Sequence, residues 1–205
     1  MIDAEGRDFP KLAPPGAGVP GYQKWVGKHV LLPLWCLSVP PARVPDRMEL
    51  QAKALEDLAR GWSAAQRERR VLVPPQIGLE DSSRFHSWAL VVEHLAVIGN
   101  SLLGILVELT HGRTPPGEAR TEAFKPRGEI GADQAIDEYR AMLRRLRRAI
   151  ETGCPDWRSP ARFPHPWFGP LGARQWASFA PFHQDIHLKQ ARRIRSLVLR
   201  SPGEG

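Results

Sequence analysis

The chain has 205 residues, of which 42% are hydrophobic and 25% are charged, and its formal net charge is +7 at pH 7. This length and balance are typical of one soluble globular domain, and two cysteines are too few for a disulfide framework or a cysteine-rich metal site. No run of 18 apolar residues and no signal-peptide pattern is present, so we expect a cytoplasmic protein with no membrane partner.

The basic balance is a reason to consider nucleic acid as a partner. The arginines, however, are spread along what should be the outer faces of helices, as in the run from Arg144 to Arg148. Charge runs of this kind are usually solvated faces. No zinc-finger, basic-zipper or RNA-recognition pattern accompanies them. We therefore do not expect nucleic acid, whereas anionic small molecules or acidic partners suit the charge.

The N-terminal part of the chain is set apart by its composition. Residues 1–21 are rich in proline and glycine, which predicts a flexible arm. The segment 22–37 is apolar and aromatic but contains Pro33, so we expect a short helix or extended stretch packed against the core. Residues 22–205 should form a single helical domain whose core spans 46–198.

Four stretches carry apolar residues at helical spacing, and their ranges are 46–70, 83–111, 133–152 and 172–198. Asp46, with Glu49 three residues later, resembles a capping box, and Ser82 or Ser83 can cap the second helix. The second helix is apolar on nearly all sides, so it should be the most buried. No strand pair is evident. The pattern predicts an all-α, antiparallel four-helix bundle, up-and-down or closely related, with an extra N-terminal segment.

A long linker separates the second and third predicted helices. Its length in a compact domain suggests a lid or binding loop. Three basic side chains lie in or beside it, Arg113, Lys125 and Arg127. We expect these to lie near the mouth of the bundle, where they could attract an anionic substrate or thiol.

The fourth predicted helix carries two histidines one turn apart, His183 and His187. Imidazoles at positions i and i+4 lie on the same side of a helix and can bind one metal ion. The same spacing also occurs by chance among core or surface histidines. His94, in the apolar second helix, needs a polar partner if it is buried, and a core histidine that has one is the alternative to a ligand.

Three sequence features resemble the DinB-like, YfiT-like metalloenzyme superfamily of bacterial four-helix bundles. They are the tryptophan-led stretch SWALVVEHL, the turn HPWFGPL followed by Trp176, and the HxxxH pair followed by Gln190 in HQDIHLKQ. The resemblance covers roughly residues 46–198. One departure is Ile186, which stands where related proteins often have a histidine directly before the last ligand.

The resemblance implies a divalent metal, zinc or nickel, held by His94, His183 and His187 with an open position for water or substrate. It also implies that Gln190, Trp176 and Phe179 support the ligands or line the pocket, and that the protein is a homodimer. Characterised relatives include transferases and isomerases that use bacillithiol, mycothiol or glutathione, in which the metal is thought to favour the deprotonated sulfur.

The expected function is therefore that of a metal-dependent enzyme acting on a small molecule, in first place a thiol S-transferase. A hydrolase at the same open site is the second enzymatic option. The alternative from another class is a non-catalytic bundle that binds a metal or a small hydrophobic ligand, or a dimeric interaction module. No other catalytic motif competes, since the sequence has no GxSxG, P-loop, GxGxxG or paired-cysteine pattern.

Overall fold

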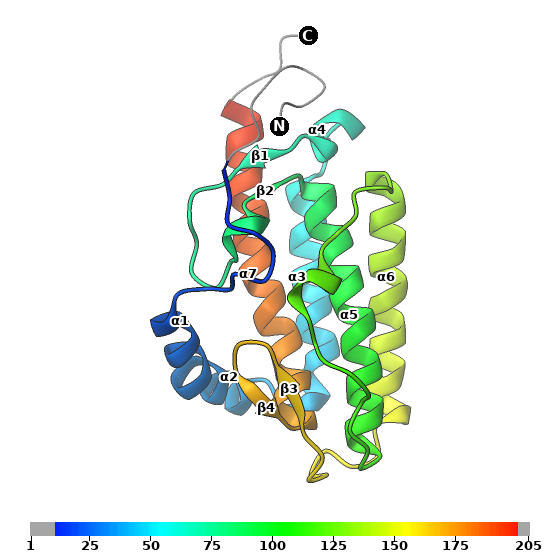
Figure 1. The fold of residues 1–205 in the computed structure, drawn as a ribbon. Helices are drawn as coiled ribbons and strands as arrows, with labels where there is room; N and C mark the ends of the chain where they lie inside the picture. The colour runs from blue at the N-terminus through cyan, green and yellow to red at the C-terminus, as the bar shows by residue number, and fades with distance from the viewer. Residues whose placement is uncertain (1–10, 201–205) are drawn as a thin grey trace.

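Four long helices form the body of the molecule, for which the computed structural model describes residues 11–200 (Figure 1). They are α3 (Val44–Leu58), α5 (Trp88–Thr110), α6 (Ala132–Arg148) and α7 (Ala173–Arg200). Helix α3 packs against α6 and α7, and α5 packs against the same two helices, which closes the ring. The predicted all-α four-helix bundle is confirmed.

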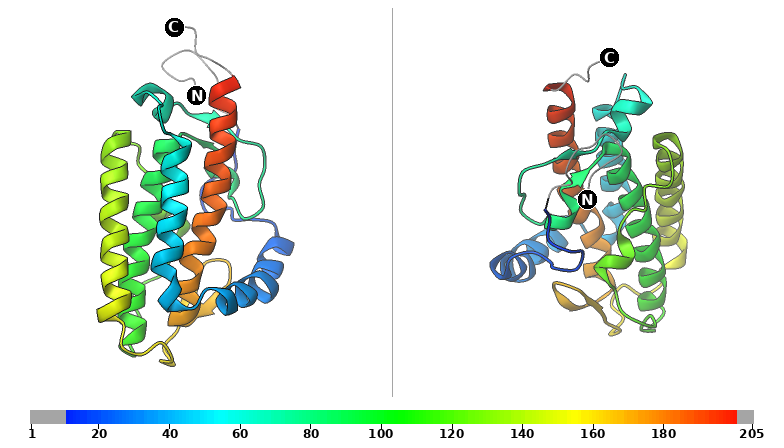
Figure 2. Two further views of the ribbon diagram at one scale, coloured as in Figure 1. Left: turned by 180° about the vertical axis from the view of Figure 1, so that it is seen from behind. Right: turned by 45° about the horizontal axis from the view of Figure 1, so that its top comes forward.

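The directions of the helices differ from a simple up-and-down bundle. Helices α3 and α7 run one way, whereas α5 and α6 run the other way and lie parallel to each other (Figures 1 and 2). The linker 111–131 makes this possible because it returns along the length of the bundle before α6 begins. Its one short helix, η4 (Thr121–Phe124), lies against α5. The expected antiparallel arrangement is therefore wrong for two neighbouring pairs, α5–α6 and α3–α7.

The first predicted helix is broken. Helix α3 ends at Leu58, and a turn with a left-handed Gly61 (φ 76°) leads into the short α4 (Ala64–Glu68). Helix α4 has a capping box in which Ser63 and Gln66 each bond the other's backbone amide. The predicted cap at Asp46 is wrong, because α3 already begins at Val44, after the turn η2 (Pro41–Arg43).

The second helix starts later than predicted, at Trp88. Its cap is Ser87, whose hydroxyl accepts a hydrogen bond from the Leu90 amide at 3.1 Å. The serines proposed as caps lie instead in the short helix η3 (Asp81–Ser83). Helix α6 continues into the π-helical turn η5 (Ala149–Gly153).

Two small antiparallel hairpins were not predicted. One pairs β1 (Val71–Leu72) with β2 (Phe85–His86), and the other pairs β3 (Phe163–His165) with β4 (Gly169–Leu171). The strands are only two or three residues long, too short for an alternating pattern to stand out in the sequence. The second hairpin contains the HPWFGPL turn and leads directly into α7.

The N-terminal segment forms a further helical arm made of α1 (Gly21–Val26), the π-helical turn η1 (Gly27–Leu31) and α2 (Leu32–Ser38). Helix α2 packs against α7. Of the arm predicted over 1–21, residues 1–10 lie outside the described part of the chain. The stretch that follows is hydrogen-bonded to the domain, since the amide of Ala13 donates to Asp81 and those of Gly16 and Gly18 donate to Glu80.

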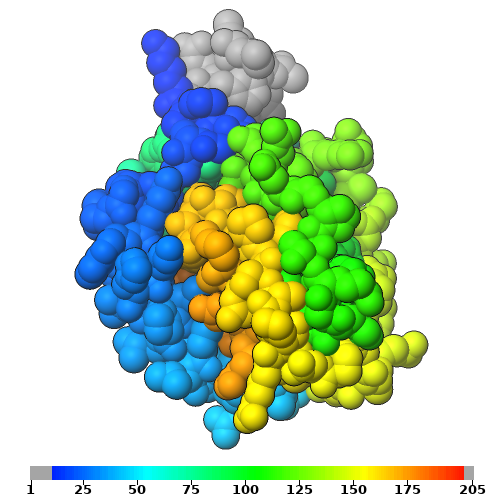
Figure 3. All heavy atoms as spheres, turned by 60° about the horizontal axis from the view of Figure 1, so that its bottom comes forward, coloured from blue at the N-terminus to red at the C-terminus, as the bar shows by residue number. Residues whose placement is uncertain are grey.

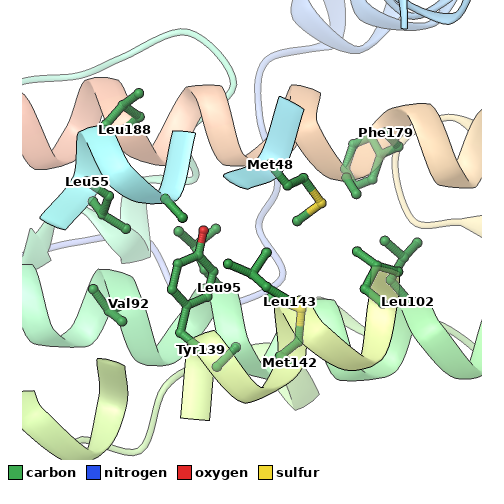
Figure 4. Close-up of a cluster of buried hydrophobic side chains, with 14 of the residues drawn as sticks. Met48, Leu55, Val92, Leu95, Leu102, Tyr139, Met142, Leu143, Phe179 and Leu188 are labelled. Atoms are coloured by element: carbon green, nitrogen blue, oxygen red, sulfur yellow. The ribbon is translucent and has the colours of Figure 1, made fainter. Parts of the chain in front are cut away.

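The core lies between the four long helices (Figure 4). Met48 and Leu55 from α3 meet Leu95 from α5, and Tyr139 and Met142 enter from α6. By length and composition α5 could cross a membrane, but 56% of its apolar stretch is buried within the bundle. That burial is what the core helix of a soluble protein shows.

Candidate metal centre

Three histidines from two antiparallel helices meet inside the bundle. His94 comes from α5, and His183 and His187 come from adjacent turns of α7. One ring nitrogen from each lies within 4.8 Å of the other two. The ring of His187 is centred 4.5 Å from those of both His94 and His183. The spacing within α7 and the packing of α5 on α7 together produce this cluster.

The backbone carbonyl of Phe124 fixes the ring of His94. Its oxygen lies 2.8 Å from Nδ1 of His94. A carbonyl can only accept, so Nδ1 carries the proton of the neutral ring. The lone pair then remains on Nε2. Proteins orient metal-binding histidines in this way, by a hydrogen bond from the ring nitrogen that does not bind the metal.

Gln190 plays the same part for His187. Its Oε1 lies 2.8 Å from Nδ1 of His187, and its Nε2 donates to the Ser83 carbonyl at 2.7 Å. The second bond fixes which end of the amide faces the histidine, so Nδ1 of His187 is the protonated nitrogen. Nε2 of His187 therefore keeps its lone pair and faces Nε2 of His183 at 3.2 Å.

These distances fit a bound divalent ion. Two imidazole nitrogens on a tetrahedral ion with bonds of 2.0–2.1 Å lie about 3.3 Å apart. The His183–His187 separation of 3.2 Å is close to that value. An N–H···N hydrogen bond between the same two rings is the alternative, but it would leave Nε2 of His94 without a partner among the described residues. One ion would satisfy all three nitrogens.

The surroundings of the three histidines favour the neutral, metal-binding form of each ring over the protonated cation. Burial lowers the pKa of His94 to about 3. Burial, and then the neighbouring histidines, lower the pKa of His183 and of His187 well below the usual histidine value. All three rings are therefore neutral at physiological pH, which is the form that binds metal.

A cavity of about 100 Å³ adjoins the cluster, and the three histidines form part of its wall. Most of the remaining wall is apolar, contributed by Leu79, Ile98, Leu102, Ile105, Phe124, Trp167, Trp176 and Phe179 among others. His187 is buried, whereas His94 and His183 keep some accessible surface. The space on the open side of the cluster can hold a few water molecules or a small chemical group.

Of the residues expected to support the ligands, two line the cavity and one lies behind a histidine. Trp176 and Phe179 line the cavity, and the indole of Trp176 donates to the Phe163 carbonyl at 3.1 Å, which ties α7 to the β3–β4 hairpin. Gln190 does not line the cavity and acts through His187. Ile186 stands where related proteins often have a histidine. Its side chain lies against Gly78, and a Cβ added at Gly78 would come within 2.8 Å of that side chain.

Of the three basic residues expected at the mouth, only Lys125 lines the cavity. Its ammonium is engaged by Glu80, Ser82 and Ser83, at 2.7 Å from an oxygen of each. Arg127 is exposed, and its amide donates to Glu93 at 2.8 Å.

Arg113 is also exposed and pairs with Glu108 at 2.7 Å. The structure does not bring Arg113 or Arg127 to the cavity wall.

Two further histidines were missed in the sequence. His165 lines the cavity, its Nδ1 accepts from the Trp167 amide at 3.1 Å, and its ring stacks on Phe168 with centroids 4.6 Å apart. Its position at the head of HPWFGPL was the signal that could have found it. His86 is buried in β2, and its Nδ1 has no partner among the described residues. No sequence pattern pointed to His86.

A family model described as the DinB superfamily matches residues 47–191 of the chain. The matched range takes in α5 and α6 and most of α3 and α7, and it includes all three histidines of the cluster. No curated protein and no solved structure matched the chain. With the match spanning more than half of the sequence, and with a four-helix bundle and a histidine cluster in place, the chain belongs to the DinB superfamily.

Proposed function

We propose that this protein is a metal-dependent S-transferase that joins a low-molecular-weight thiol to a small, largely apolar electrophile. The observation that carries the proposal is the convergence of three neutral imidazoles on one point at the wall of an apolar cavity. Three protein ligands with an open side are the arrangement of catalytic rather than structural zinc sites. Zinc and nickel both accept imidazole ligands.

A divalent ion, when bound, would favour the deprotonated form of a thiol sulfur at neutral pH. The protein supplies the rest of the arrangement. Phe124 and Gln190 hold the rings of His94 and His187 so that Nε2 of each faces the shared point. In the overall reaction a carbon–sulfur bond forms as the bond from carbon to its leaving group breaks, and the thiol proton is released to solvent.

The wall of the cavity indicates the kind of electrophile. Trp167, Trp176 and Phe179 present aromatic surface, and His165 adds one polar edge. Since Nδ1 of His165 accepts a hydrogen bond, its ring proton is on Nε2, which has no partner among the described residues. Such a wall suits an apolar or aromatic group with a single hydrogen-bond acceptor.

Transfer to a thiol is favoured over hydrolysis by the state of Glu80. Glu80 is the one carboxylate among the described residues that line the cavity. Its two oxygens accept hydrogen bonds from Gly16, Gly18, Ser82 and Lys125. A general base must reach the proton that it removes, and this carboxylate is fully engaged.

Binding without catalysis is the second candidate, and the small volume of the cavity favours it. About 100 Å³ is less than the usual size of a pocket for a small molecule. In that case the protein would hold a metal and a small apolar ligand only.

The proposed S-transferase would work in the reducing cytoplasm, because low-molecular-weight thiols and the two free cysteines stay reduced there.

The experiment is a thiol-consumption assay with the zinc- and nickel-loaded protein. Bacillithiol, mycothiol and glutathione are each offered together with an aromatic electrophile such as monochlorobimane, and conjugate fluorescence is followed. We expect conjugation with at least one thiol that requires metal and is lost in His183→Ala. Conjugation no faster than the uncatalysed rate with all three thiols, in protein shown to hold metal, would leave binding without catalysis as the function.

A further inference from the structure

His165, in strand β3, is a buried histidine on the wall of the cavity that does not belong to the metal cluster. Aromatic rings enclose its imidazole. Phe168 stacks on it with centroids 4.6 Å apart, Phe179 meets it edge-on at 4.6 Å, and Trp176 lies at 5.2 Å. The β3–β4 hairpin that carries it reaches the surface between the N-terminal arm and the linker 111–131 (Figure 3). These contacts fix the direction in which the ring points.

The two ring nitrogens of His165 have different roles. Nδ1 accepts a hydrogen bond from the Trp167 amide at 3.1 Å, so the proton of the neutral ring is on Nε2. Nε2 has no acceptor among the described residues and keeps some accessible surface. Burial lowers the pKa of His165 to about 3, so Nε2 remains a neutral donor at physiological pH. An unused donor in a largely apolar wall indicates a ligand atom that accepts from it.

This donor lies within reach of a molecule that also touches the metal cluster. The ring of Phe179 is centred 4.6 Å from that of His165 and 5.5 Å from that of His183. The rings of the two histidines are therefore centred at most 10.1 Å apart, the sum of those two distances. Both histidines line the same cavity. A small molecule in the cavity can have one atom beside the cluster and another beside Nε2 of His165.

The charges of the wall decide which acceptor fits. Lys125 is the one cationic side chain among the described residues of the wall, and a carboxylate and two hydroxyls engage its ammonium. Burial holds the pKa of each of the four histidines of the wall well below the usual histidine value. A substrate with a formal negative charge would therefore meet no free cation there. A neutral donor suits an oxygen that is uncharged when it binds and becomes negative during the reaction.

We propose that His165 is a catalytic hydrogen-bond donor and that the electrophile is an epoxide, whose ring oxygen accepts from Nε2. This inference rests on the proposed thiol transfer and names the class of its second substrate. A three-membered ring adds little volume to the group that carries it, which suits a cavity of about 100 Å³.

The reaction balances with His165 neutral throughout. The thiol sulfur bonds to a carbon of the epoxide, the carbon–oxygen bond opens, and its electron pair goes to the oxygen that faces Nε2. That oxygen then takes a proton from water, while the thiol proton is released to solvent. The product is a hydroxy thioether, and no proton is gained or lost overall. The donor stabilises the charge on the oxygen as the bond opens.

Two substitutions separate the donor from the packing of the hairpin. His165→Asn can still accept from the Trp167 amide near the position of Nδ1, but its side chain is too short to place a donor at Nε2. His165→Gln places an amide N–H near the position of Nε2. Each metal-loaded variant is given bacillithiol, mycothiol or glutathione with styrene oxide or benzyl chloride. Both electrophiles offer a benzylic carbon, and they differ in the atom that takes the negative charge.

We expect His165→Asn to lower kcat/KM for styrene oxide about 100-fold and that for benzyl chloride less than about threefold, because the donor acts on the oxygen. His165→Gln should keep most of the activity towards styrene oxide. Equal losses for the two electrophiles, or a glutamine variant as slow as the asparagine variant, would show that His165 only holds the hairpin.

Binding without thiol gives a second readout. Acetophenone and α-methylstyrene have nearly the same shape, but only the first has an oxygen acceptor. Their affinities are measured by quenching of tryptophan fluorescence, and the preference for acetophenone should fall about tenfold in His165→Asn and persist in His165→Gln. A preference that falls in Ser101→Ala instead would assign the donor to another side chain of the same wall and overturn the proposal.

The two readouts distinguish the failure of this inference from the failure of thiol transfer. If no thiol is conjugated but the preference for acetophenone falls in His165→Asn, thiol transfer fails and the donor site at His165 stands. If conjugation proceeds and His165→Asn changes neither the preference nor the rate with styrene oxide, thiol transfer stands and the role of His165 is overturned. Unchanged circular dichroism and thermal melting would show that the variants fold.

Discussion

At the scale of single residues, the candidate metal centre depends on partners that do not themselves face the shared point. Gln190 is fully buried and bridges the ring of His187 to the carbonyl of Ser83. The carbonyl of Phe124 holds His94. These contacts select the tautomers that leave Nε2 of His94 and of His187 free. Gln190 and Phe124 therefore set the geometry of the cluster as much as the histidines do.

Gln190→Ala should weaken zinc affinity about 10–100-fold, because His187 loses the acceptor that orients its ring. The matched control is Gln184→Ala on the same helix. Gln184 is equally buried, but its amide donates to the Met48 carbonyl on α3 at 3.1 Å and does not touch a histidine. Both changes should lower the melting temperature, and only the first should change affinity measured by competition with a chelating dye. Equal affinities in the two variants would remove Gln190 from the site.

The metal-free protein should be sensitive to mild acid. Burial lowers the pKa of His86, His94 and His165 to about 3, and it lowers the pKa of His183 and His187 well below 6.5. The unfolded chain then binds more protons than the folded chain below pH 6.5, so stability falls as pH falls. At pH 5.5 each such histidine lowers the free energy of unfolding by about 1.4 kcal/mol.

At that pH the five histidines with lowered pKa would together remove a free energy of unfolding comparable to the whole stability of a typical domain. Denaturant unfolding between pH 7 and 5 should show this loss, with proton uptake on unfolding. A stability that is flat from pH 7 to 5 would contradict the buried, neutral state of the cluster.

The sequence located part of this site. The four-residue spacing of His183 and His187 follows from helical geometry, and the family resemblance added His94. The carbonyls of Phe124 and Ser83 could not be found in the same way, because every residue has a carbonyl and only the path of a loop decides which one faces a ring. His86 and His165 lie on short strands whose pairing depends on contacts distant in sequence.

At the scale of elements, the close approach of α5 and α6 depends on one glycine. A Cβ at Gly99 would lie 2.3 Å from the sulfur of Met142, which is fully buried on α6. Gly104, also on α5, has nothing within 4 Å of its Cβ position. The two glycines therefore have different reasons to be there.

Gly99→Ala should destabilise the protein by about 1–3 kcal/mol, because the added methyl overpacks the α5–α6 contact. Gly104→Ala should instead stabilise it by about 0.5–1 kcal/mol, since alanine costs less backbone entropy in a helix. Urea unfolding of the two variants measures both effects. A stabilising Gly99→Ala would mean that the two helices lie further apart than the structure shows.

The crossover 111–131 is held on α5 by Glu93, whose carboxylate accepts hydrogen bonds from the amides of Arg127 at 2.8 Å and Gly128 at 3.1 Å. Glu93→Ala should cost about 1.5–3 kcal/mol and should speed amide exchange in residues 121–128. Glu122→Ala, on the same crossover but exposed, should do neither. Unchanged exchange in Glu93→Ala would show that other contacts hold the crossover.

The directions of the helices were the least accessible part of the fold. Apolar periodicity identifies the inward face of a helix. The same spacing results whichever way the helix runs in the bundle, so it does not predict the direction. The one signal was the length of the linker, which allows the chain to return before α6 starts. The range 46–70 was read as one helix because the apolar spacing continues past Gly61 to Trp62, whereas the left-handed conformation at Gly61 ends it.

At the scale of the whole molecule, the bundle and the metal centre should be separable. The core that joins α3, α5 and α6 is made of aliphatic, methionine and aromatic side chains (Figure 4). Replacing one histidine by alanine should therefore leave the helices in place. A bound metal should add stability, by about 4 kcal/mol when its free concentration is 1,000-fold above its Kd.

The most direct test of the metal centre is elemental analysis and isothermal titration of protein purified without a histidine tag. We predict one zinc or nickel ion per chain at neutral pH. His94→Ala, His183→Ala and His187→Ala should each weaken binding more than about 100-fold while keeping the helical circular dichroism of the parent. Variants that hold metal as tightly as the parent, or a parent that takes up no zinc, nickel, manganese or iron, would show that the three histidines are structural.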